Sequence, residues 1–84
     1  MIDVKEIKHV ELYTSVLYKN YYAVDIFVER GGMIFKIRYP YNLQSVAENA
    51  VRAMKNKQQQ DIPTPDYKPC IWAVGFIDYN KRSK

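Results

Sequence analysis

The chain has 84 residues, 48% of them hydrophobic, and a formal net charge of +4. This length and composition indicate one globular domain, residues 1–84, and exclude general disorder. Cys70 is the only cysteine, so it forms no internal disulfide and cannot supply a metal site by itself; a small domain without disulfides is typical of the cytoplasm. No apolar run approaches the roughly 18 residues that cross a bilayer, and residues 1–8 lack an apolar leader. We therefore expect no signal peptide and no membrane partner.

Residues 9–18 are expected to form the first strand, because apolar residues alternate through them. A three-residue loop, 19–21, would then put Val16 opposite Val24, with Asn20 as the residue in the left-handed region. The same register would put Leu12 opposite Val28. An alternative remains for the start of the chain, since Asp3 begins a plausible short helix at Val4.

Residues 22–39 predict a β-hairpin. Apolar residues alternate on both sides of Gly31-Gly32, and two glycines accept the positive φ angles of a two-residue turn. The turn fixes the register of the two strands. On one face, Val28 is expected opposite Phe35, Ile26 opposite Ile37 and Val24 opposite Tyr39. On the other face, the expected pairs are Glu29 with Ile34, Phe27 with Lys36 and Asp25 with Arg38. A slip of one residue would mix these two faces.

A helix of about 15 residues is expected after the third strand, which Pro40 should end. Its apolar positions recur with helical spacing and form one stripe: Leu43, Val46, Ala47, Ala50, Val51 and Met54. Either Asn42 caps this helix, or Ser45 does so with Glu48 completing a capping box. Prolines at 63, 65 and 69 predict an irregular loop over 58–69, and residues 70–77, apolar on both faces, predict the last strand. The polar residues 80–84 are expected to be a flexible tail.

The fold class is therefore α+β, a four-stranded, mostly antiparallel sheet with one helix on one face, in the order β-β-β-α-β. Because the helix returns the chain across the sheet, the last strand is expected to lie parallel to the third or to the first. The helix should leave the opposite sheet face open, and that face and the last strand carry many apolar residues. An exposed apolar face and a bare apolar edge both favour association. The alternative is that the N-terminal segment with Ile2, Val4 and Ile7 covers the open face.

Catalytic motifs are absent from the sequence, and we expect no enzyme, no cofactor, no metal and no small-molecule substrate. His9 shares a strand face with Glu11, but a histidine without a placed nucleophile is more often structural. Cys70 is expected to be a buried, inert thiol. The chain contains eight tyrosines, a residue that is common at interfaces and that also stacks on unpaired bases.

These patterns favour a non-enzymatic binding module, an adaptor or an inhibitor, that recognises a protein partner or forms a homodimer. Its expected protein interface consists of Tyr13, Phe27, Ile34, Ile71 and Ile77. The alternative is a nucleic-acid-binding domain, since basic and aromatic residues interleave on the open face and the charge excess lies at the helix end and in the tail. Its expected contacts are Lys36, Arg38, Lys55, Lys57, Lys81 and Arg82.

Overall fold

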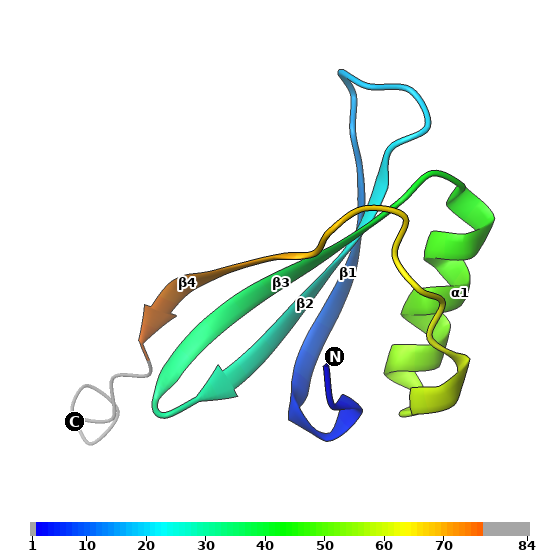
Figure 1. Cartoon of the computed structure of the whole chain (residues 1–84). Helices are drawn as coiled ribbons and strands as arrows, with labels where there is room; N and C mark the ends of the chain where they lie inside the picture. The colour runs from blue at the N-terminus through cyan, green and yellow to red at the C-terminus, as the bar shows by residue number, and fades with distance from the viewer. Residues whose placement is uncertain (1, 77–84) are drawn as a thin grey trace.

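The computed structural model describes residues 2–76, in which a four-stranded antiparallel sheet carries one helix on one face (Figure 1). The predicted fold class and the order β-β-β-α-β are confirmed. In chain order the elements are a 3₁₀ turn (Val4–Glu6), β1 (Ile7–Thr14), β2 (Tyr22–Arg30), β3 (Met33–Tyr41), α1 (Gln44–Lys55), a second 3₁₀ turn (Gln59–Asp61) and β4 (Cys70–Phe76). The strands lie in the order β1-β2-β3-β4. Ile77 and the expected flexible tail are outside the described residues.

The hairpin of β2 and β3 has the predicted register, including the pairs Val28–Phe35 and Asp25–Arg38. Its turn also has the predicted chemistry, because Gly31 (φ 59°) and Gly32 (φ 80°) both occupy the left-handed region. A two-residue turn of this kind matches the right-handed twist of the strands that it joins.

The predicted register of β1 is wrong. Leu12 pairs with Val24, where Val16 was expected, so β1 ends at Thr14 and a loop of residues 15–21 follows. The period of two in a strand sorts residues between faces, and a shift by an even number of residues preserves that sorting. Asn20 nevertheless occupies the left-handed region as predicted, with φ 57°. The alternative at the start of the chain is also present, since the Oδ1 of Asp3 accepts a hydrogen bond from the Lys5 amide (2.9 Å) at the first 3₁₀ turn.

Pro40 does not end β3, which runs on to Tyr41. The Pro40 carbonyl accepts a hydrogen bond from the Asp66 amide (2.9 Å), so it points away from β2. The nitrogen and carbonyl of one strand residue point to the same side, and the missing N–H of Pro40 therefore removes no bond to β2.

Helix α1 packs the predicted stripe except Leu43 against the core, but its cap differs from both expectations. The N-cap position is Leu43, which is exposed, and no side chain caps the helix. The Asn42 amide instead donates to the Asp66 carboxylate (2.8 Å), and Glu48 accepts from the Gln44 side chain. A loop contact thus replaces the local cap that the sequence suggested.

The N-terminal segment lies on the helix side of the sheet, so it does not cover the open face. Ile2, Val4 and Ile7 belong to the buried core cluster. The Gln59 side chain accepts from the Val4 amide (2.9 Å) and donates to the Ile2 carbonyl (2.7 Å). Lys57, two residues after the end of α1, has φ 57° and donates through Nζ to the Val4 and Ile7 carbonyls, both at 3.1 Å. These bonds join the N-terminal segment to the residues that directly follow α1.

Strand β4 pairs antiparallel with β3, so the expectation of a parallel last strand is wrong. The loop over 56–69 is the reason. After α1 has returned the chain once, this loop returns it again, and the bonds of Asp66 to Pro40 and Asn42 hold it at the far end of β3. Cys70 therefore begins β4 opposite Arg38, and the strand runs back along β3. Figure 1 shows β4 at the edge of the sheet farther from α1.

Candidate functional site

The open face, the sheet face opposite α1, is built around one buried carboxylate. Asp25 is only 3% exposed. Arg38 on the neighbouring strand binds it with two hydrogen bonds, Nε to Oδ1 at 2.7 Å and one terminal nitrogen to Oδ2 at 2.9 Å. The Lys36 ammonium lies 3.8 Å from the same carboxylate. The hydrogen bond to Asp25 raises the pKa of Arg38 above its usual value.

Both cations of the open face also lie over aromatic rings. The guanidinium carbon of Arg38 is 4.3 Å from the ring centre of Tyr13 on β1 and 5.6 Å from that of Trp72 on β4. The Lys36 ammonium is 5.2 Å from the ring centre of Phe27 on β2 and 5.6 Å from that of Trp72. Cation–π contacts of this kind favour a fixed arrangement of the side chains. The open face is thus a layer of alternating rings and cations that spans all four strands.

This layer changes the expected protein interface. Tyr13 is exposed, but Phe27 lies partly beneath Lys36, and Phe27 and Ile34 are only half-buried residues of a mixed face. Ile71 pairs with Ile37 and lies on the helix side of the sheet, so the structure does not bring it together with Tyr13. Ile77 is outside the described residues. Sequence reasoning missed Trp72, which the antiparallel β4 places opposite Lys36.

Strand β4 is the most exposed apolar element of the sheet. Ile71 is 53% exposed, Trp72 39% and Val74 45%, and these side chains lie on both faces of the strand. No charged residue or proline occurs within 70–76. Cys70 is exposed, which corrects the expectation of a buried thiol. The reason is that α1 packs mainly against β1 and β2 and leaves β4 uncovered.

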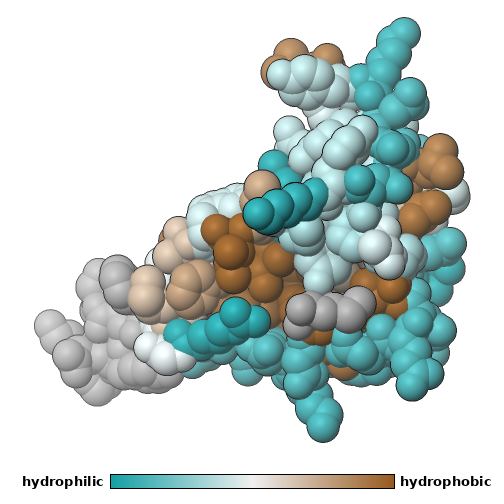
Figure 2. Space-filling model, in the orientation of Figure 1, coloured by the Kyte–Doolittle hydropathy of each residue, from teal (hydrophilic) through white to brown (hydrophobic). Residues whose placement is uncertain are grey.

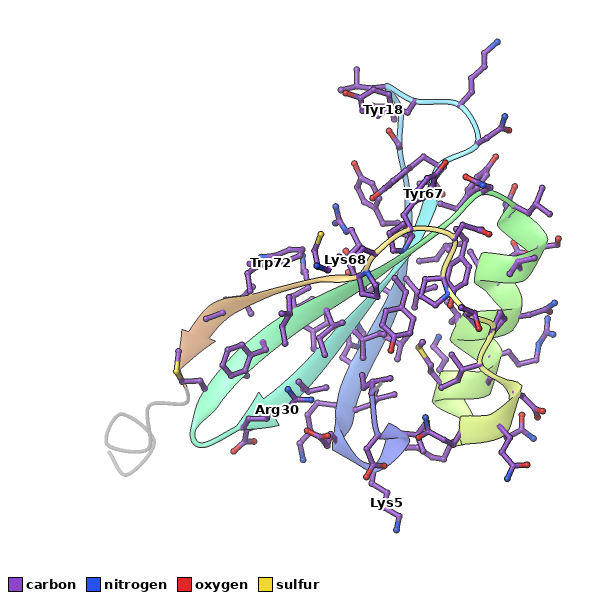
Figure 3. All side chains as sticks on the ribbon, in the orientation of Figure 1. Lys5, Tyr18, Arg30, Tyr67, Lys68 and Trp72 are labelled. Carbon is purple, nitrogen blue, oxygen red and sulfur yellow. The ribbon has the colours of Figure 1, made fainter. Side chains whose placement is uncertain are left out.

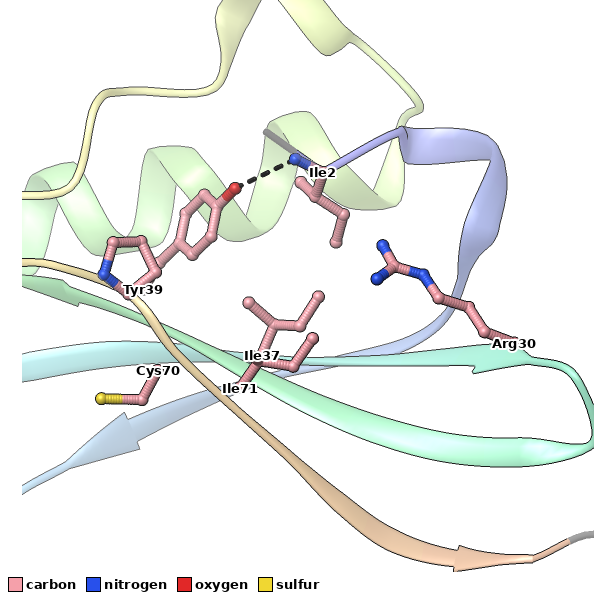
Figure 4. A pocket seen from close by; sticks show the side chains of 7 residues that line it. Ile2, Arg30, Ile37, Tyr39, Cys70 and Ile71 are labelled. Atoms are coloured by element: carbon pink, nitrogen blue, oxygen red, sulfur yellow. Dashed lines mark hydrogen bonds between the residues drawn. The ribbon is translucent and has the colours of Figure 1, made fainter.

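A shallow hollow of about 340 Å³ lies on the helix side, between β4 and the N-terminal segment (Figure 4). It is lined by Ile2, Arg30, Ile37, Tyr39, Pro69, Cys70 and Ile71. The Ile2 amide donates to the Tyr39 hydroxyl (3.3 Å) at its wall. Figure 2 shows apolar surface over β3 and β4 in this region. The hollow extends the exposed apolar surface of β4 toward the core.

The residues expected to bind nucleic acid do not meet on one surface. Lys36 and Arg38 lie on the open face, whereas α1 and Lys55 lie on the other side of the sheet. The Lys57 ammonium is bonded to two backbone carbonyls of the N-terminal segment. Lys81 and Arg82 are outside the described residues.

His9 and Glu11 form an exposed pair, with Nε2 and Oε1 3.0 Å apart, and the His9 ring lies 5.6 Å from that of Phe27. Over residues 2–76, no group of three histidine, cysteine or carboxylate side chains is arranged to hold a metal ion.

In the same part of the chain, no helix has both the length and the apolar character needed to cross a bilayer.

Comparison with models of protein families, with curated proteins and with solved structures found no match to this chain.

Proposed function

We propose that this chain is a non-enzymatic protein-binding module that pairs with another chain through β4, and that its first partner is a second copy of itself. The observation that supports the proposal is that β4 is a sheet edge with exposed apolar side chains on both faces. Its outer backbone N–H and C=O groups can accept a further strand, and main-chain hydrogen bonds of this type give affinity in strand addition.

The two edges of the sheet differ in how they are protected. The other edge, β1, carries Lys8, His9 and Glu11, three polar side chains of the kind that discourage pairing. Each edge strand has one register irregularity, so local twist does not distinguish them. The two edges differ in charge, because β1 carries charged side chains and β4 carries none. Association at β4 is therefore favoured over association at β1.

Antiparallel pairing of β4 with the β4 of a second copy would place Trp72 near Val74 of that copy, with Ala73 at the centre. Large side chains would thus face smaller ones, and no like charges would meet, because β4 carries no charged side chain. The resulting sheet would be continuous across the two copies. A module of this type can act as an adaptor or as an inhibitor of a larger protein.

The test is the mass of the full chain in solution, measured by sedimentation equilibrium at low and high salt. We expect a dimer of the 10.0 kDa chain at both salt concentrations, and a monomer for Val74→Lys, which places a charge on the edge. Glu11→Lys on β1 is the matched control and should stay dimeric. A monomeric wild-type chain contradicts self-pairing. If the wild-type chain also selects no extended peptide from a peptide library, with Val74→Lys as the variant expected not to bind, strand addition at β4 is ruled out altogether.

Nucleic-acid binding remains the second candidate function, because Lys36 and Arg38 alternate with three aromatic rings on the open face. Asp25 already neutralises Arg38, which weighs against phosphate contacts. Binding of a fluorescent single-stranded oligonucleotide should fall steeply with salt if phosphates are contacted, since each contact releases counterions. The dimer mass should instead be insensitive to salt.

A further inference from the structure

The loop between β1 and β2, residues 15–21, is the second exposed apolar feature, and we call it the arm. Figure 1 shows the arm standing beyond the rest of the domain, at the end away from the first 3₁₀ turn. Three consecutive large apolar side chains occupy it. Val16 is 96% exposed, Leu17 82% and Tyr18 70%. Loops are commonly polar, so three such side chains in sequence at a projecting end indicate a contact with something apolar.

The conformation of the arm is held by its own hydrogen bonds. The Ser15 hydroxyl accepts from the Leu17 amide (3.2 Å) and from the Tyr18 amide (3.1 Å). The Ser15 amide in turn donates to the Tyr21 carbonyl (3.4 Å). Two amides at the apex therefore already have partners inside the arm. This lowers the cost of moving the apex out of water, because an unpaired amide is expensive in an apolar medium.

We propose that the arm docks the protein on the surface of a lipid bilayer that contains anionic lipid. Val16 and Leu17 form the aliphatic apex, and Tyr18 and Lys19 follow directly. Aliphatic side chains enter the acyl region, whereas tyrosine and lysine prefer the headgroup level. Residues 12–24 contain no acidic side chain, so no carboxylate in this stretch would be repelled by anionic headgroups. The stretch also contains four tyrosines: Tyr13, Tyr18, Tyr21 and Tyr22.

The composition of the apex favours lipid over a cleft in another protein. Energetically dominant residues in protein interfaces are enriched in tryptophan, tyrosine and arginine, whereas leucine and valine are under-represented. A projecting apex also reaches a flat surface without interference from the rest of the domain. In Figure 3 the side chain of Tyr18 lies at the arm, and those of Lys5 and Arg30 lie at the opposite end of the molecule. Docking through an exposed loop differs from the expectation of no membrane partner, which considered only spanning segments and leaders.

The test is flotation of the full chain with vesicles of equal parts phosphatidylcholine and phosphatidylglycerol. We expect the wild type to float with these vesicles and Leu17→Ser to lose about tenfold in partition, the loss expected when one leucine is no longer buried. Lys19→Gln should lose about fivefold, and only on vesicles with anionic lipid. In Leu17→Trp, the fluorescence of the new tryptophan is obtained by subtracting the wild-type emission of Trp72. Its emission maximum should shift to shorter wavelength on the same vesicles.

Val74→Lys on β4 is the matched control, since it should float as wild type while it loses the dimer. Leu17→Ser should keep the dimer and lose flotation, so the two proposals fail separately. Leu17 is exposed, and an unchanged unfolding midpoint for Leu17→Ser will show that its fold is intact. The proposal is overturned if the wild type does not float with either vesicles containing phosphatidylglycerol or vesicles of phosphatidylcholine alone, or if Leu17→Ser floats equally. If the arm instead inserts into a cleft of another protein, the wild type should float with neither kind of vesicle.

Discussion

Replacing Arg38 with methionine tests whether the buried carboxylate of the open face depends on its partner. Methionine keeps much of the apolar stem and removes the guanidinium, so Asp25 loses two charge-assisted hydrogen bonds at 2.7 and 2.9 Å. Leaving one charge of a buried pair without its partner costs about 3–5 kcal/mol. Lys36, with its ammonium 3.8 Å from Asp25, remains as a weaker partner. We therefore expect the lower end, a loss of about 3 kcal/mol.

The assay is urea unfolding at neutral pH, followed by far-ultraviolet circular dichroism. The urea experiment should show a free energy of unfolding that is about 3 kcal/mol lower than that of the wild type. In thermal unfolding, the same loss corresponds to a decrease in Tm of about 12 °C or more for a domain of this length. Arg30→Met is the matched control, because Arg30 also binds a carboxylate at 2.7 Å, that of Glu6, but the pair is exposed. Exposed ion pairs contribute little, so this variant should stay close to wild type. Equal losses of stability in the two variants would refute the argument that burial makes the Arg38–Asp25 pair contribute more to the free energy of unfolding than the exposed pair does.

Two further predictions concern the contact of Tyr41 with the loop before β4 and the conformation of Asn20 in the arm. Burial raises the pKa of Tyr41, whose hydroxyl donates to the Pro63 carbonyl (2.8 Å), so the folded state holds the phenol proton more tightly than the unfolded chain. Stability should therefore be unaffected by this group below about pH 10 and fall by about 1.4 kcal/mol per pH unit above it. Tyr41→Phe should lose that slope in urea titrations from pH 9 to 11 and cost about 1 kcal/mol at neutral pH, and an unchanged slope would contradict the assignment. Asn20 has φ 57°, so Asn20→Val should cost about 1 kcal/mol and Asn20→Gly should be nearly neutral; equal effects in thermal unfolding would mean that this conformation is not maintained in solution.

The parts of the fold that were predictable are those where local chemistry and periodicity agree. The β2–β3 register follows from Gly31-Gly32 together with two alternating strands, because the turn leaves one register that sorts both faces. The β1–β2 register lacked such a turn, and an even shift leaves every apolar residue on the same face. Only the hydrogen bonds of Ser15 and the conformation of Asn20 close the longer loop.

The candidate site was predictable only in part, because it depends on the direction of β4. A parallel last strand would not have put Trp72 opposite Lys36, and its place between two cations could not be read from the sequence. The direction is set by the loop before β4, through the long-range bonds of Asp66 to Asn42 and Pro40. The apolar edge itself was visible in the sequence, since an uncharged strand reads as apolar whichever way it runs.

The hydrogen bonds between the N-terminal segment and the residues that follow α1 have a consequence for folding during synthesis. The bonds of Gln59 to Ile2 and Val4 join residues 57 and 55 positions apart. Ile2 and Val4 leave the ribosome before Gln59, and therefore cannot reach their place in the core until residues 57–59 have emerged. We expect the β2–β3 hairpin to form early, since its contacts are local, and the core to close late. Until then Ile2, Val4 and Ile7 stay exposed to water, and a nascent chain stalled before residue 57 should be cleaved by proteases around these residues.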